Sequence, residues 1–208
     1  MLFHMARADL SRMGFLLAGG KSSRMGMNTD KAFLDFGGQT LLDRALSVMG
    51  TVCDSVAIVG DPAKFAKCGS TKYGPVVADI FSGCGPLAGI HAALVHSPAE
   101  LNLMLAVDMP FVSTKLLAFL FAAAEHNDAV VTVPRTTQGL QPLCAVYRRD
   151  FSTTAEQALR AGNYKIDAAF AGVSIRVIEE AELVAAGFSE RSFFNVNTPQ
   201  DRLAAEGA

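Results

Sequence analysis

Three positive charges lie close together in a segment that is rich in small residues. Lys21, Arg24 and Lys31 fall within the run GFLLAGGKSSRMGMNTDK at residues 14–31, and only Asp30 opposes them. Glycines let main-chain N–H groups approach an anion closely, and the cations neutralise its charge. The segment therefore predicts a binding site for phosphate oxygens, such as those of a nucleoside polyphosphate.

Two better-known phosphate loops do not fit this segment. A Walker A loop requires its first glycine at position 15, where Phe15 stands, although residues 20–22 match the end of the motif. The dinucleotide fingerprint G-x-G-x-x-G fails in every frame across residues 14–26, which disfavours a Rossmann dehydrogenase. For the segment taken alone, an ordinary Gly-rich connection with solvated charges stays an alternative.

Two aspartates at the ends of predicted strands are placed to take part in the same phosphate binding. Asp79 follows residues 76–78, and Asp108 follows residues 101–107, which are apolar almost throughout, as in the middle of a parallel sheet. The carboxyl ends of such strands lie at one edge of the sheet, where the cationic segment also begins. A carboxylate beside a triphosphate needs a bridging divalent cation, which predicts Mg²⁺ at Asp108 or Asp79. Aspartate also commonly forms turns, and for either residue singly that alternative stays open.

The side chains present suit phosphoryl or nucleotidyl transfer. The sequence offers no Ser-His-Asp or Cys-His arrangement for covalent catalysis, and His91 and His96 are poorly spaced for a shared metal. The four cysteines form no C-x-x-C motif, which favours reduced thiols over zinc binding. In phosphoryl transfer, catalysis consists of holding the phosphates in line and neutralising charge.

The composition predicts one globular domain. The chain has 208 residues, of which 50% are hydrophobic and 18% charged, so it can form a sizeable core. Its net charge of −2 provides no general attraction to nucleic acid or to anionic membranes. We expect residues 1–13 to be an N-terminal extension and residues 14–208 to form the single domain that carries the nucleotidyl-transfer chemistry. A cytoplasmic location is expected, because the sequence has neither a secretory signal nor a membrane-spanning run.

The elements that position these residues alternate along the chain. The predicted strands are residues 15–18, 56–59, 76–78, 101–107, 129–133, 143–147 and 173–178, with a short extended piece at 33–36. The predicted helices are residues 41–49, 86–97, 114–125, 153–161 and 165–171, and a last helix that begins with Thr198 and Pro199. Thr40, Ser113 and Thr198 are placed to cap helices. This alternation predicts the α/β class, with a single doubly wound, mostly parallel sheet and helices on both faces.

Five sequence blocks in this order resemble those of a known family. The blocks are LAGGKSSRMG at 17–26 followed by DK, GPLAGI at 85–90, DMPF at 108–111, QPLCAVY at 141–147 and FNVNTP at 194–199. They are similar to those of the molybdenum cofactor guanylyltransferases, which belong to the nucleoside-triphosphate transferases with a Rossmann-like fold. The blocks extend over nearly the whole chain, and their combination is more specific than any one of them.

The resemblance implies a set of functional residues. The nucleotide-binding residues would be Leu17, Ala18, Gly19, Gly20, Lys31, Asp79 and Asp108. Asp108 would also bind Mg²⁺. From their charge, we predict that Arg24 and Lys31 act with it in catalysis by holding the triphosphate and the leaving pyrophosphate. Asn195 and Asn197 would bind the pterin substrate.

The reaction implied is attack by the terminal phosphate of molybdopterin, or of its molybdenum-loaded form, on the α-phosphate of GTP. Pyrophosphate would be released, and the guanine dinucleotide form of the cofactor would result. The implied partners are GTP, molybdopterin or molybdenum cofactor, and, transiently, molybdenum cofactor enzymes or their chaperones. Neither nucleic acid nor a membrane is implied.

Two departures and three alternatives accompany this resemblance. Residues 27–29 form a longer spacer before Asp30 than the family usually has, and residues 59–61 lack the asparagine that the family commonly carries there. The alternatives are a cytidylyltransferase for the same pterin, another alcohol-phosphate nucleotidyltransferase, and a nucleotide-binding module without turnover. The cytidylyl branch tends to have LAAG where this chain has LAGG, which favours guanylyl transfer.

Overall fold

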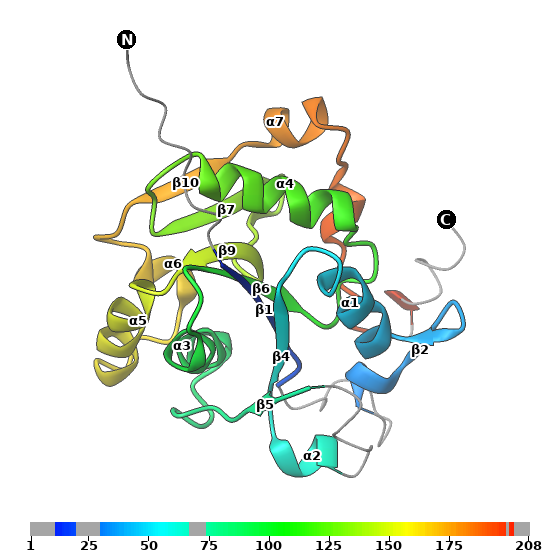
Figure 1. Ribbon diagram of the computed structural model, residues 1–208, viewed down its shortest axis with the longest axis horizontal. Coiled ribbons are helices and arrows are strands. Elements are labelled where there is room, and N and C mark those ends of the chain that lie inside the picture. Colours follow the sequence, from blue (N-terminus) through cyan, green and yellow to red (C-terminus); the bar gives the residue numbers. More distant parts are fainter. Residues whose placement is uncertain (1–10, 20–29, 67–73, 199, 202–208) are drawn as a thin grey trace.

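The computed structural model describes residues 11–19, 30–66, 74–198 and 200–201. The predictions for Gly20, Lys21, Arg24 and Pro199, and the spacer at 27–29, lie outside these residues. In the described part of the chain, strands and helices alternate as the sequence predicts, and the sheet separates two groups of helices (Figure 1).

The central sheet is mixed and mostly parallel. Its strands are β1 (Arg12–Leu17), β4 (Ser55–Val59), β5 (Val76–Val77), β6 (Leu101–Ala106), β7 (Val131–Thr136), β8 (Gly139–Leu140), β9 (Cys144–Arg148) and β10 (Ile175–Ile178). Their order is β10-β7-β9-β6-β1-β4-β5, and β8 pairs with β7 beside this path. A separate hairpin consists of β2 (Asp35–Phe36) and β3 (Gln39–Thr40).

Strand β9 is the reversal in this sheet. β1 pairs in parallel with β4 and β6, and β7 with β10, whereas β9 runs antiparallel to both β6 and β7. Only residues 137–143 connect β7 to β9. A parallel crossover needs about a dozen residues or more, so this connection forces a hairpin. The mostly parallel sheet is confirmed, with β9 and the short β8 as its antiparallel strands.

The predicted helices up to residue 171 are present, and most of the last predicted helix lies outside the described residues. The helices are α1 (Leu41–Met49), α2 (Pro62–Ala66), α3 (Pro86–His96), α4 (Thr114–Glu125), α5 (Phe151–Arg160), α6 (Ile166–Ala169) and α7 (Glu180–Ala185), with 3-10 turns η1 (Lys31–Phe33) and η3 (Glu190–Phe193). The side chains of Thr40, Ser113 and Thr198 accept main-chain N–H groups three residues later. The sequence analysis did not identify α2, α7, β8, η1 or η3, which are short.

Helices cover both faces of the sheet. In β1, Leu16 packs in the core with residues of α1 and α4, whereas its neighbour Phe15 packs on the opposite face with residues of α3 and α5. Both side chains are fully buried. Successive side chains of a strand point to opposite faces, so an apolar run such as β1 belongs in the middle of a covered sheet.

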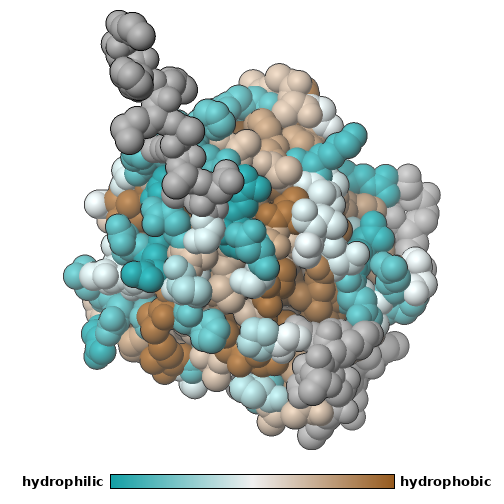
Figure 2. All heavy atoms as spheres, in the orientation of Figure 1, coloured by the Kyte–Doolittle hydropathy of each residue, from teal (hydrophilic) through white to brown (hydrophobic). Residues whose placement is uncertain are grey.

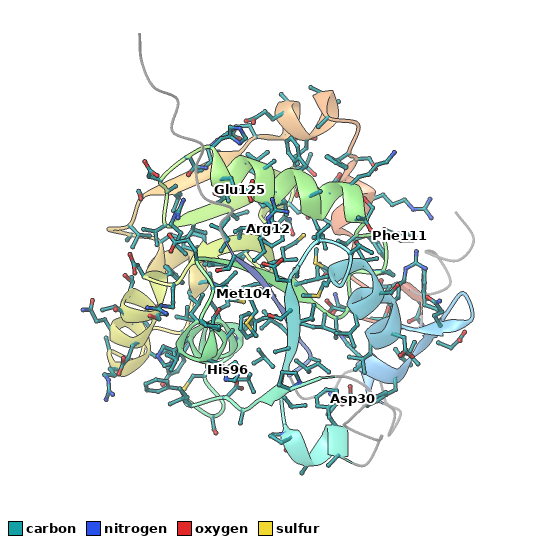
Figure 3. All side chains as sticks on the ribbon, in the orientation of Figure 1. Arg12, Asp30, His96, Met104, Phe111 and Glu125 are labelled. Atoms are coloured by element: carbon teal, nitrogen blue, oxygen red, sulfur yellow. The ribbon has the colours of Figure 1, made fainter. Side chains whose placement is uncertain are left out.

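Strand β1 begins earlier than predicted, at Arg12 instead of Phe15. The Arg12 backbone N–H donates to Asp54 Oδ2 at 2.8 Å. Its guanidinium donates to Glu125 Oε1 at 2.8 Å and lies over the ring of Phe121. Figure 3 shows Arg12 and Glu125 next to each other. This pairing allows a charged residue to begin a strand that is otherwise apolar.

The exterior combines polar and apolar residues. Hydrophilic and hydrophobic residues are interspersed on the face drawn in Figure 2, which is ordinary for a protein surface in contact with water. Among the described residues, no helix has both the length and the apolar character needed to span a membrane.

Candidate active site

The ends of four neighbouring strands form the edge at which the candidate site lies. Beyond β1, the Ala18 N–H donates to Val59 O at 3.0 Å, and Leu17 O accepts from the Val107 N–H at 3.2 Å. Asp79 follows β5, and Asp108 follows β6. Because β1, β4, β5 and β6 are parallel neighbours, these residues lie at the same edge of the sheet.

Three segments that are distant in sequence meet at Lys31. Its Nζ lies 3.6 Å from Asp108 Oδ2 and donates to Asn197 Oδ1 at 2.6 Å. Lys31 begins the turn η1, and Asp30 caps that turn by accepting the Ala32 N–H at 3.0 Å. The structure therefore brings together a predicted cation, a predicted metal ligand and a predicted pterin ligand.

Asp108 has an incompletely satisfied carboxylate. Its Oδ1 is buried and has no hydrogen-bond partner among the described residues. Burial raises the pKa of Asp108, and the nearby Lys31 offsets part of that rise. The Asp108 main-chain oxygen accepts from the Val196 N–H at 2.8 Å, which ties the C-terminal segment to the end of β6. A buried anionic oxygen with unused lone pairs suits a divalent cation.

Asp79 faces the start of α3. Burial raises the pKa of Asp79, and a Cβ atom placed on Gly89 would lie 3.7 Å from its Oδ1 and 3.5 Å from Leu17 Cδ2. Gly85, just before α3, has a φ of +74°, a conformation that favours glycine. The GPLAGI block thus brings helix backbone close to the carboxylate, a role that the sequence analysis did not assign to Gly89.

Any metal at this edge would need ligands from a substrate as well. Among the residues that the structure describes, no group of three or more His, Cys, Asp or Glu side chains could hold a metal ion. Phosphate oxygens supply the missing ligands when magnesium binds a nucleotide. The donor set therefore fits a metal that arrives with a triphosphate.

Leu17, Ala18 and Gly19, which are predicted to contact the nucleotide, differ in their exposure. Ala18 is buried, Leu17 is half-buried and Gly19 is exposed. Among the described residues, a Cβ on Gly19 would make only ordinary contacts, 3.9 Å to Gly60 Cα and to Val59 O, so the packing of those residues does not require glycine there. Gly20, Lys21 and Arg24 lie outside the described residues.

Asn195 and Asn197 lie at a turn that the side chain of Asp201 stabilises. Asp201 Oδ2 accepts the N–H groups of Asn197 and Thr198 at 2.8 Å each, and these bonds lower the pKa of Asp201. Among the described residues, the Asn195 amide donates to Phe193 O at a long 3.5 Å. The Asp201 carboxylate therefore stabilises the turn at residues 197–198.

Sequence analysis missed Lys64, which lies beside the site on α2. Its Nζ donates to Ala18 O at 2.9 Å and lies 2.5 Å from Asp30 Oδ2. The sequence signal for α2 was Asp61 followed by Pro62, because aspartate is typical of a helix N-cap and proline of the first helical position. Asp61 Oδ1 does accept the Ala63 N–H at 2.9 Å.

A lysine, strand-end carboxylates and a mostly parallel sheet define the class of this protein, a nucleotidyltransferase. A family model described as the MobA-like NTP transferase domain matches residues 14–174. The chain belongs to this family of MobA-like NTP transferases, as the sequence blocks predict.

Named relatives are similar over nearly their whole length. A protein of Pelotomaculum thermopropionicum named probable molybdenum cofactor guanylyltransferase is 38% identical, and the alignment covers 94% of this chain and 92% of the relative. The molybdenum cofactor guanylyltransferase of Desulfosudis oleivorans is 34% identical over 94% of each chain. The crystal structure of molybdopterin-guanine dinucleotide biosynthesis protein A from Archaeoglobus fulgidus superposes with a TM-score of 0.81 at 28% identity, covering 94% of this chain and 97% of that one.

Proposed function

We propose that this protein transfers GMP from GTP to the terminal phosphate of molybdopterin or molybdenum cofactor. The observation that carries the proposal is the meeting of Lys31, Asp108 and Asn197 at the carboxyl edge of the sheet. The relatives' names supply the substrate class. The products are pyrophosphate and the guanine dinucleotide form of the cofactor.

In the proposed reaction, an oxygen of the pterin's terminal phosphate attacks the α-phosphorus of GTP. A new P–O bond forms as the bond to the β-phosphate oxygen breaks, and pyrophosphate leaves. Lys31 neutralises charge that develops on the leaving group, and Arg24 is proposed to do the same. Asp108 would hold Mg²⁺, which when bound would supply positive charge that offsets the carboxylate and the phosphates.

The test is pyrophosphate release by the purified protein in the presence of GTP, molybdopterin and Mg²⁺. We expect release to require all three components, because the pterin provides the nucleophile. GTP binding without any pyrophosphate release would favour a nucleotide-binding module instead. We also propose a cytoplasmic location and transient contact with the enzymes or chaperones that receive the product.

Guanine is the expected base. Gly19 carries no side chain, so a purine can approach main-chain donors and acceptors near Ala18. A site that pairs with guanine's amide edge leaves buried groups unsatisfied when another base binds, so discrimination on the order of 10³-fold or more is expected. Competition among GTP, ATP and CTP in one reaction measures it. Preferential CMP attachment would instead place the chain in the cytidylyl branch.

Asn195 and Asn197 are expected to bind the pterin, and the two variants should differ. Asn195→Ala should weaken molybdopterin binding about tenfold, the value of one or two hydrogen bonds, and leave GTP binding unchanged. Asn197→Ala should do the same and also lower turnover, because Asn197 holds Lys31.

Separate titrations with GTP and with molybdopterin measure both effects. The family match ends at residue 174, so these measurements also test the part of the site that lies beyond it. Weaker GTP binding with intact pterin binding in both variants would contradict the assignment.

A further inference from the structure

The Lys64 side chain contacts described residues on both sides of positions 20–29. Its ammonium contacts Ala18, directly after β1, and Asp30, directly before η1. Figure 3 shows Asp30 beside α2, the helix that carries Lys64. One side chain from a third segment of the chain therefore bridges the residues on either side of positions 20–29.

The Lys64 ammonium is held in place by its surroundings. Its Nζ lies 4.8 Å from the centre of the Phe65 ring and 5.9 Å from that of Phe33, and the two rings contact each other. Phe65 is fully buried, which anchors α2. The Lys64 side chain is only 19% exposed. An ammonium confined between rings, a carbonyl and a carboxylate differs from a solvated surface lysine, whose ion pairs contribute little.

Asp30 transmits this restraint to Lys31. Both oxygens of the Asp30 carboxylate are engaged: Oδ1 accepts the Ala32 N–H that closes η1, and Oδ2 pairs with Lys64. The next residue is Lys31, whose ammonium reaches Asp108 and Asn197. Releasing Asp30 from Lys64 frees the cap of the turn from which Lys31 projects.

We propose that Lys64 is a positioning residue for nucleotidyl transfer, which fixes Asp30 and thereby places Lys31 against Asp108. The expected loss of kcat rests on the proposed function. The expected displacement of Lys31 does not. Lys64 acts through Asp30 and not on the phosphates, because its own charge is already paired with that carboxylate. A displacement of about 1 Å in a catalytic group can cost about 100-fold in rate.

The test combines kinetics with crystal structures of four variants: Lys64→Met, Asp30→Asn, the double variant and Lys64→Arg. Methionine keeps the packing over Phe33 and Phe65 without the charge. We expect Lys64→Met to lower kcat about 10- to 100-fold with a smaller change in the KM for GTP. The double variant should be no slower than the slower single variant, because both remove one interaction. Lys64→Arg should recover part of kcat, and Lys165→Met, at an exposed lysine, is the control.

Crystal structures test the positioning role of Lys64 without relying on the proposed function. In Lys64→Met we expect Lys31 Nζ to move away from Asp108 relative to the wild-type protein, and this readout needs no substrate. If the wild-type protein has no turnover, the proposed function fails and the Lys31 position alone decides the inference. An unmoved Lys31, or a kcat equal to that of the wild type, would overturn the positioning role. The positioning role would also be overturned if the losses of kcat in the two single variants added up in the double variant.

Discussion

Asp108→Asn is expected to reduce nucleotidyl transfer by about 10³-fold or more. The carboxylate is the group at the site best placed to hold Mg²⁺, because its Oδ1 is buried without a hydrogen-bond partner in the described structure. Metal stabilisation of a phosphoryl transition state amounts to several kcal/mol, and each 1.4 kcal/mol corresponds to about tenfold in rate. Turnover with GTP, molybdopterin and Mg²⁺ measures the loss.

The same substitution should not destabilise the fold. Burial raises the pKa of Asp108 above its unfolded value, so the folded state binds the proton more tightly. The carboxyl then favours folding at acidic pH, and this contribution is lost as the pH rises through the folded-state pKa. At pH 7 without metal, the uncharged amide should give an equal or higher Tm. The difference in Tm between the variant and the wild type should shrink as the pH falls.

A matched control is Asp150→Asn, an exposed aspartate before α5 whose side chain caps no N–H group. It should leave both turnover and Tm unchanged. Near-normal activity of Asp108→Asn in Mg²⁺ would contradict the metal assignment. An inactive variant with a strongly lowered Tm would indicate a structural role for the carboxylate instead.

Lys31→Ala is expected to lower kcat by about 10²- to 10³-fold. Its ammonium lies where the predicted phosphate loop and the metal-binding carboxylate meet, 3.6 Å from Asp108 Oδ2. A preorganised donor aimed at developing charge contributes about this much to catalysis. The contact matters most in the transition state, when charge accumulates on the leaving pyrophosphate. The KM for GTP should therefore change less than kcat.

Steady-state kinetics with varied GTP separate the two parameters. Lys165→Ala, at an exposed lysine before α6, removes the same charge elsewhere and should leave both unchanged. A Lys31→Ala enzyme with normal kcat and only a higher KM would limit Lys31 to nucleotide binding. Normal values of both parameters would exclude it from the site.

Local signals predicted the elements that carry the site. The apolar runs of β1 and β6 belong to strands covered on both faces, and their type follows from hydrophobicity, although β1 begins three residues before its apolar run. The caps at Thr40 and Ser113 are short-range hydrogen bonds, which sequence spacing specifies directly. Asp79 and Asp108 come to one edge of the sheet because parallel strands end there.

Contacts between distant segments escaped prediction. The hydrogen bond from Lys31 to Asn197 joins residues 166 positions apart, and no local pattern specifies such a pair. Lys64 was missed because α2 is only five residues long, too short for a helical periodicity to be visible. The reversed direction of β9 likewise depends on the length of the β7–β9 connection and not on the composition of either strand.

Transfer of label from GTP to the pterin tests the proposed function most directly. The purified protein is incubated with molybdopterin and Mg²⁺, in parallel with GTP labelled at the α-phosphate and at the γ-phosphate. We expect the α label in the pterin product and the γ label in pyrophosphate, because the α-phosphorus is attacked. The γ label in the pterin product, or neither label there, would contradict guanylyl transfer by this protein.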